Sequence, residues 1–379
     1  MSNTEQNNAR AFVSFASIDP YLQTNIVSPK ETLVASKDLV EWGDKNAYPD
    51  YLLELYNNAP TLRSIINGNI DYITGDDVLL NAILPTLGEG VMNRKGDTIR
   101  DQVKDIAKDF EIYGGFALQV IRNLSGEVAE VYYLDMRYLR TNKEGNVFYY
   151  CEKWNKPGKK DTLVYPAFLP FLEWDKLTPE ERARHASSIL FVKDIHTQVY
   201  PSPLYGASVK ACELERNIDN YHLNAINNGF VSSVMINFNN GIPSDEIKAQ
   251  IENDFNEKFS GHQNAGRIMF SWNPSKEAAT TITPFKTEDF GEKYDALAKH
   301  SRQQIFTAFR ANPNLFGIPT DNNGFSNEEY TESFKLYNRT QIQPIQRLIA
   351  ETYEKVFKMK GVLTIVPFSM GGETEDNIS

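Results

Sequence analysis

Apolar and small residues recur at alternating spacings of three and four in the segment that begins at Pro203. This set, which we call the seam, consists of Leu204, Ala207, Ala211, Leu214, Ile218, Tyr221 and Ala225. Heptad spacing of this kind predicts a long amphipathic helix over residues 203–230 with one apolar stripe. Two or three heptads fit packing inside one chain and packing between copies equally well, so both interpretations stay open.

A second long helical pattern follows over residues 287–310, with Tyr294 and Leu297 among its apolar positions. The compact insert between the two helices, residues 231–286, is predicted to form strand, helix and strand, with a further short strand at Thr280–Phe285. Two helices with a small domain inserted between them are more typical of a protein that assembles from copies than of a self-contained enzyme.

Residues 1–202 are predicted to form an α+β domain. Helical spacing is found after Pro49 and again over Thr98–Tyr113, where Gly114–Gly115 should end the helix. Short alternating segments between Phe116 and Tyr165 predict one small antiparallel sheet. The first 40 residues are predicted to be loosely ordered.

The chain continues after the second long helix with a polar loop and a further helix. The loop spans residues 311–327 and is rich in proline, asparagine and glycine. Apolar spacing predicts a helix over Asn327–Lys358, which Pro344 should kink. The polar tail from Gly371 onward is predicted to be mobile.

The charge balance bears on possible partners. Among 379 residues, 39 Lys and Arg face 50 Asp and Glu, giving a net charge of −11. This argues against a protein that grips nucleic acid, which requires a basic surface. An acidic wall would instead let DNA slide past, because like charges keep the polymer from sticking.

Compartment and membrane association follow from other features of the sequence. No apolar run approaches the ~20 residues that a membrane span requires. The polar N-terminus lacks the apolar core of a secretion signal, so a cytosolic protein, or one assembled in a cytosol, is expected. Cys151 and Cys212 are predicted to be free thiols.

The sequence does not contain the usual motifs of phosphate, dinucleotide or metal chemistry. The five histidines are not spaced as metal ligands, so neither a metal nor a cofactor is expected. A solvated helix face is the favoured interpretation of Asp105, Asp109 and Glu111, and a polar sheet edge that of His196. Four lysines around Trp154 are interpreted as a hairpin turn that displays lysines, with a nucleic-acid contact as the alternative.

Several segments resemble the portal proteins of tailed bacteriophages, of the short type found in long-tailed phages. They are Pro201–Gly206, Glu213–Asn228, Asn228–Ile236, Gly261–Ile268, Ile305–Pro319, Phe325–Glu329 and Ile342–Ile345. Their order and spacing along the chain carry the resemblance. The N-terminal 40 residues match poorly, and the chain has Asn312-Pro313-Asn314 where the family often has a proline pair.

The resemblance implies a portal-like α+β fold. Residues 1–202 would form an α/β wing, 203–230 and 287–310 the two stem helices, and 231–286 a small α/β clip inserted between them. Residues 311–327 would form a channel loop. Residues 328–379 would complete the wing or form a short helical crown with a mobile tail.

The resemblance also implies a function without catalysis. Copies would form a ring, usually of twelve, at one capsid vertex of a virion assembled in the bacterial cytoplasm. Double-stranded DNA would pass through the ring without sequence preference, driven in by the terminase large subunit. The other implied partners are the head–tail connector or adaptor and the major capsid protein or scaffold; no membrane and no cofactor are implied.

Three groups of residues are assigned roles by this resemblance. The DNA-facing channel loop would comprise Asn314, Asp321, Asn322, Asn323, Gly324 and Phe325. Stem contacts between copies would comprise Ala207, Ala211, Leu214, Ile218, Tyr221, Ala225, Tyr294 and Leu297. Clip contacts with terminase or connector would comprise Asn239, Asn240, Asp245, Glu252, His262, Asn264 and Trp272.

Two other classes of function fit the sequence. An oligomeric adaptor or scaffold would bind proteins without handling DNA and would lack a central pore. A nuclease-like enzyme on an oligomerising stalk would require a carboxylate or histidine cluster, and the sequence does not group such residues at a recognisable spacing.

Overall fold

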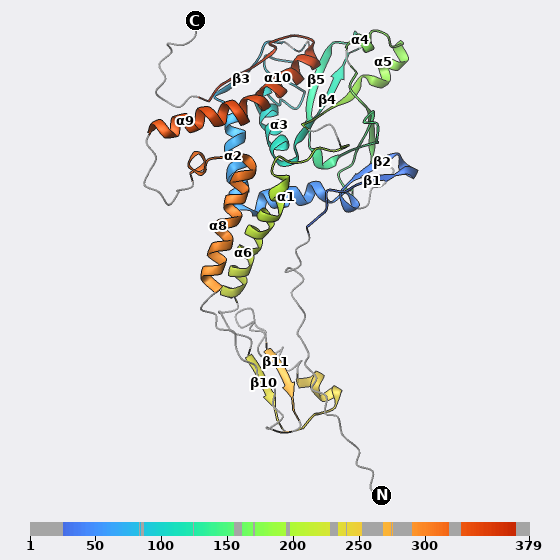
Figure 1. The fold of residues 1–379 in the computed structure, drawn as a ribbon. Coiled ribbons are helices and arrows are strands. Elements are labelled where there is room, and N and C mark those ends of the chain that lie inside the picture. The colour runs from blue at the N-terminus through green and yellow to red at the C-terminus, as the bar shows by residue number, and fades with distance from the viewer. Residues whose placement is uncertain are drawn as a thin grey trace. The chain divides into compact units, whose positions relative to one another are not determined.

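The chain forms two compact units, seen here in a computed structural model (Figure 1). One unit contains residues 26–213 and 301–379, and the other contains residues 1–25 and 214–300. The structure describes residues 26–82, 84, 87–123, 125–154, 161–169, 171–194, 198–227, 234–239, 241–251, 268–273, 275, 290–317 and 327–368. The larger unit is therefore discontinuous in sequence, because residues 214–300, which belong to the smaller unit, separate its two segments.

Most of the helices belong to the larger unit. They are α1 (Tyr48–Asn58), α2 (Pro60–Thr74), α3 (Ile99–Tyr113), α4 (Phe171–Trp174), α5 (Pro179–His185), α9 (Asn327–Tyr337) and α10 (Gln343–Phe357). The two long helices, α6 (Val209–Asn227) and α8 (Phe290–Phe309), contribute residues to both units. The helices predicted after Pro49, over 98–113, 203–230 and 287–310 are thus confirmed, with shifted ends.

The described strands of the larger unit form three sheets. They are β1 (Glu31–Val34), β2 (Leu39–Trp42), β3 (Asp77–Leu80), β4 (Gly115–Arg122), β5 (Val128–Leu134), β6 (Leu139–Thr141), β7 (Val147–Tyr150), β8 (Leu163–Pro166), β9 (Ser187–Lys193) and β12 (Leu363–Val366). Their orders are β1-β2-β6-β7-β8, β5-β4-β9 and β12-β3. All of these pairings are antiparallel.

The prediction of one small sheet is wrong in two respects. The strands between residues 116 and 165 divide between two sheets, because β4 pairs with β5 and β9 while β6 pairs with β2 and β7. Within the first 40 residues, predicted to be loosely ordered, residues 31–40 supply β1 and the start of β2. Local alternation indicates a strand but not its partner, which here comes from about 100 residues away.

The C-terminal helix packs into the same core as the N-terminal helices. Ile349 and Tyr353 of α10 are fully buried in one cluster with Ile66 of α2 and Val103 of α3. Strand β12 pairs with β3, joining Val366 to Asp77 in register. Residues 343–366 therefore belong to the packing unit of the predicted wing.

Helix α3 has the boundaries that its sequence encodes. The Thr98 side chain accepts a hydrogen bond from the backbone N–H of Asp101, and the Asp101 carboxylate accepts one from Thr98 N, which makes a capping box. Gly114 ends the helix at φ +82. A Cβ there would lie 2.1 Å from the carbonyl oxygen of Ser202, so only glycine fits.

The predicted helix over 327–358 consists of two helices. A π-helical segment, Asn338–Ile342, separates α9 from α10. Pro344 lies in the first turn of α10, directly after the π-helical segment, and its missing N–H leaves one helical hydrogen bond unmade. The kink predicted at Pro344 stays a prediction; directly before this residue the structure has a π-helical segment, a feature that often marks functional sites.

The described part of the smaller unit contains a two-stranded parallel sheet. Strand β10 (Val234–Phe238) pairs in parallel with β11 (Ile268–Trp272), with residues 245–251 helical between them. A crossover of this length is what parallel pairing requires, so the predicted strand–helix–strand order is confirmed. The strand predicted at 280–285 lies outside the described residues.

Candidate functional site

The start of α6 is fixed to the end of α8 within the larger unit. The Tyr205 ring stacks on Phe309 with a centroid distance of 5.5 Å, and its hydroxyl donates to the carbonyl of Ile112 over 3.0 Å. Ser208 Oγ donates to the carbonyl of Gln304 over 2.9 Å. Cys212 is fully buried on the same side of α6. The chain's own core therefore uses a helix face that the seam does not include.

The seam itself is divided. Leu204 is 39% exposed, Ala207 is exposed, and Ala211 and Leu214 are half-buried. Ile218 is 6% exposed and so is buried within its own chain. The first part of the seam is thus left accessible by this chain, whereas Ile218 is internal packing.

The structure describes the side chains of only some of the other predicted stem residues. The side chains of Tyr221 and Ala225 lie outside those that the structure describes. On α8, Tyr294 is half-buried and Leu297 is 41% exposed. The role of all these residues between copies stays a prediction.

The segment after α8 begins with an anchored turn. Asn314 lies in a 3-10 turn, Pro313–Phe316, and its backbone N–H donates to the Asn312 side chain, which caps the turn. Tyr72 of α2 donates its hydroxyl hydrogen bond to the carbonyl of Leu315 over 2.9 Å. A Cβ at Gly68 would lie 2.8 Å from the Phe316 ring. Residues 312–317 are therefore held against α2.

This anchoring changes the expected extent of the channel loop. Asn314 is half-buried in the turn, so it is placed at the fixed base of the segment. The other proposed channel residues, Asp321, Asn322, Asn323, Gly324 and Phe325, lie outside the described residues.

The described clip candidates differ in exposure. Trp272 is 5% exposed and stacks on Phe238 at a centroid distance of 4.4 Å, so its ring is not presented to a partner. Asn239 is half-buried and accepts a hydrogen bond from the side chain of Asn273. Asp245 is exposed and pairs with Lys248. Asn240, Glu252, His262 and Asn264 lie outside the described residues.

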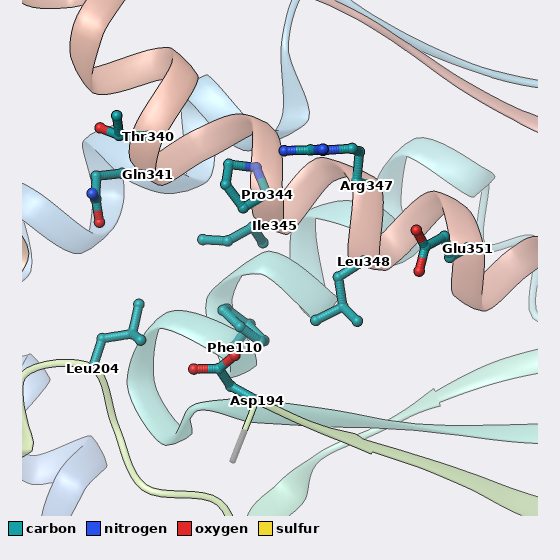
Figure 2. Close-up of a pocket in the computed structure, with 10 residues that line it drawn as sticks. All are labelled: Phe110, Asp194, Leu204, Thr340, Gln341, Pro344, Ile345, Arg347, Leu348 and Glu351. Atoms are coloured by element: carbon teal, nitrogen blue, oxygen red, sulfur yellow. The ribbon is translucent and has the colours of Figure 1, made fainter. Parts of the chain in front are cut away.

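A groove lies between α10 and α3 (Figure 2). Figure 2 shows Ile345 and Leu348 of α10 on the side that faces Phe110 of α3, with Arg347 and Glu351 along the same helix. The groove encloses about 400 Å³. Its lining is Phe110, Asp194, Leu204, Thr340, Gln341, Pro344, Ile345, Arg347, Leu348 and Glu351. Seam residue Leu204 is therefore also a groove residue.

A second cavity of about 230 Å³ shares part of this lining. We call it the Glu111 chamber; it is lined by Asn69, Glu111, Leu204, Ala308, Phe309, Arg310, Tyr337, Gln341 and Ile345. Glu111 is fully buried, and burial raises the pKa of its carboxyl group to about 7. Asp109 is 3% exposed, and burial raises its carboxyl pKa as well.

The sequence interpretation of these acids as a solvated face is therefore wrong for two of the three. Asp105 is exposed, but Asp109 and Glu111 point into the larger unit. The reason is that the last turn of α3 is surrounded by other elements, so its polar positions are covered as well as its apolar ones.

The remaining candidates do not form a chemical site in the described ranges. Trp154 donates to the carbonyl of Tyr138 and lies under the guanidinium of Arg140, so its ring is used internally. Cys151 and Cys212 are buried free thiols, as predicted. His196 lies outside the described residues. Among the described residues, no His, Cys, Asp and Glu group suits a metal, and no helix could cross a membrane.

Comparison with solved structures shows where this fold occurs. The chain resembles one in a virion of a native gene transfer agent particle, with a TM-score of 0.51, 14% identity and 83% of each chain covered. It also resembles one in the neck of an empty gene transfer agent particle, with a TM-score of 0.51, 14% identity and coverage of 90% of this chain and 86% of the other. The fold is therefore one found in virus-like particles.

The sequence comparisons identify the family. The family model described as phage portal protein matches residues 94–367, and the chain belongs to this family. It is 23% identical over 257 residues to the probable portal protein of Haemophilus phage HP1 (strain HP1c1), covering 67% of this chain and 68% of the relative. Its function is that of a portal protein associated with the virion, and the α+β portal-like fold is confirmed.

Proposed function

We propose that copies of this chain form a closed ring at one capsid vertex and that the ring is a conduit for double-stranded DNA. The observation that carries the ring is the accessible first part of the seam, next to a helix face already filled by the chain's own core. Repetition of one such heterologous contact closes into a ring when the rotation allows it. The similar chain in a neck structure computed with C6 symmetry supports this arrangement.

The proposed partners follow from the conduit. The terminase large subunit would drive DNA through the ring, the clip would contact terminase and later the connector, and the wing would face the major capsid protein or scaffold. The net charge of −11 supports passage of DNA over retention. Twelve copies, assembly in the bacterial cytoplasm and a purely structural, non-catalytic role complete the proposal.

Charged substitutions at the accessible part of the seam are expected to block the ring. Ala207→Glu and Leu214→Glu should weaken each subunit contact at least about tenfold, because each buries a carboxylate in an apolar contact. Negative-stain images and mass photometry of the purified protein measure the assembly. Ala183→Glu, at an exposed alanine of α5, is the matched control.

The outcome separates the two interpretations of the seam. Contact between copies is supported if wild type and Ala183→Glu form rings while the seam variants do not. The subunits of the seam variants should then keep the thermal stability of wild type. Wild-type particles without a central pore would favour an adaptor over a conduit. Rings from Ala207→Glu and Leu214→Glu would show that this part of the seam is not an interface.

Replacing residues 320–325 with a Gly-Ser link of equal length is expected to reduce the DNA packaged per particle several-fold while rings still form. The proposed loop acts on DNA by steric contact and transient hydrogen bonds, which the link does not reproduce. Nuclease-protected DNA per particle measures the effect in a phage that carries the variant. Unchanged packaging would show that these residues do not act on DNA in the channel.

A further inference from the structure

The Glu111 chamber contains a carboxylate oxygen without a partner. Tyr337 of α9 donates its hydroxyl hydrogen bond to Asn69 Oδ1 over 2.8 Å, and Asn69 Nδ2 donates to Glu111 Oε2 over 3.0 Å. Glu111 Oε1 is buried and accepts no hydrogen bond. A buried carboxylate with one unsatisfied oxygen is costly when ionised, so the chamber has room for a donor and a chemical reason to hold one.

A donor of the right kind lines the same chamber. Arg310 follows directly after α8, and its side chain is exposed. Its backbone is fixed, because Arg310 N donates to the carbonyl of Thr307, Ala311 N donates to that of Phe306, and Phe309 is buried. The backbone of Arg310 adopts φ +51. Rotation of the side chain alone can therefore carry the guanidinium inward.

We infer that the Glu111 chamber is a guanidinium site and that Arg310 of the same chain is its occupant in a second, closed conformation. A guanidinium presents planar N–H donors that match a carboxylate, so the closed form satisfies Glu111 Oε1. Leu204, Phe309 and Ile345 would enclose its aliphatic stem. The pair ties the end of α8 to α3 by a contact that opens and closes.

We call the pairing of Arg310 with Glu111 the latch, and its position in the chain connects it to the proposed channel loop. Arg310 immediately precedes the anchored turn at 312–317 and the proposed channel loop. A closed latch would hold the base of that segment against the larger unit more firmly than an open one. This link to the channel depends on the proposed function, whereas the pairing of Arg310 with Glu111 does not.

The charge state of Glu111 should control the latch. The titratable or charged groups around it are Tyr337 of α9, Tyr205 before α6 and Arg310 after α8. Asn69 of α2 and Gln341 of the π-helical segment are neutral. Both tyrosines have their pKa raised by burial and stay neutral at pH 8, so Arg310 is the cation available in this chamber.

A double-mutant cycle tests the pairing. Wild type, Glu111→Gln, Arg310→Met and the double variant are unfolded in urea at pH 5.5 and 8.5, at one protein concentration and with the assembly state recorded. At pH 8.5, Arg310→Met should lower the folding equilibrium constant at least tenfold when Glu111 is present and less than twofold when Gln is present. At pH 5.5, where Glu111 is protonated, the two effects should be equal within twofold.

Arg347→Met in the same two backgrounds is the control, because Arg347 lines the groove but not the Glu111 chamber. It should show no coupling to Glu111 at either pH. Equal effects of Arg310→Met in both backgrounds at pH 8.5 would overturn the latch and leave water as the partner of Glu111. Coupling to Arg347 in place of Arg310 would overturn it as well. The cycle can be measured whether or not rings form, so its failure is distinct from failure of the proposed ring.

Discussion

Glu111→Gln is expected to make the protein more stable than wild type at pH 8 and to leave its stability at pH 5 nearly unchanged. The carboxyl pKa is about 7 in the folded chain, above its ordinary value of 4.5, because burial disfavours the charged form. A raised folded-state pKa means that full stability is present below pH 4.5 and is lost as the pH rises through about 7. Glutamine does not ionise and escapes this loss.

The gain should reach about 3 kcal/mol when Arg310 is also replaced, since each pKa unit corresponds to about 1.4 kcal/mol. With Arg310 present, pairing offsets part of the cost, and the gain should be about 1–2 kcal/mol. Urea unfolding across pH 5 to 8.5 measures both values. Glu328→Gln, at an exposed acid of α9, is the control and should show little pH-dependent gain. A flat difference across pH would mean that Glu111 stays ionised in the folded chain throughout.

Arg140→Met is expected to destabilise the larger unit by about 3–5 kcal/mol. Arg140 is 1% exposed, and its guanidinium donates to Asn46 Oδ1, to the Asn46 carbonyl and to the carbonyls of Arg137 and Leu139. It also lies over the rings of Trp42 and Trp154. Methionine fills the volume but leaves these acceptors without donors. Urea unfolding followed by tryptophan fluorescence measures the loss.

Arg339→Met, at an exposed arginine of the π-helical segment, is the matched control and should change stability by less than about 0.5 kcal/mol. A loss below about 1 kcal/mol for Arg140→Met would contradict the argument. It would mean that the freed carbonyls find other donors and that removing a buried charge compensates for the lost hydrogen bonds.

Long helices with regular apolar spacing could be predicted from the sequence, because helix formation depends on neighbours three and four residues away. The residues that begin and end helix α3, namely the capping box of Thr98 and Asp101 and the terminal Gly114, lie within or next to the helix in the sequence. The strand–helix–strand order of residues 234–272 was also predicted from local spacing, whereas the parallel pairing of β10 with β11 was not. Each of these features depends on residues that are close in the chain.

Sheet partners could not be predicted in the same way. The β3–β12 pair joins residues 77–80 to 363–366, and β2–β6 joins Val40 to Thr141. Strands of three or four residues carry almost no register information on their own. The sequence also could not show whether the first part of the seam packs inside the chain or faces outward. The contacts of Tyr205, Ser208 and Cys212 answer this, because they show which face of α6 packs against the chain's own core.

The buried acids of α3 show a different limit. Periodicity places Val103, Ile106 and Phe110 on one face and Glu111 off it, which favours exposure. At residues 109–113 every side chain is buried, so polarity no longer reports orientation. One available signal was Ile112, whose apolar side chain falls on the side of the helix opposite the main stripe and indicates a covered last turn. Arg310 has no signal of its own, because only the position of the end of α8 in the fold brings it to the lining of the Glu111 chamber.

The antiparallel pairing of β3 with β12 has a consequence for synthesis on the ribosome. The β12-β3 sheet of the larger unit cannot form until residues 363–366 have emerged, although β3 is synthesised by residue 80. Both strands of the β10–β11 pair are translated by residue 272. The smaller unit can therefore acquire its native pairing while the early helices still await their last strand. Nascent chains should expose the apolar faces of α2 and α3 for most of translation, a period in which chaperone binding would protect them.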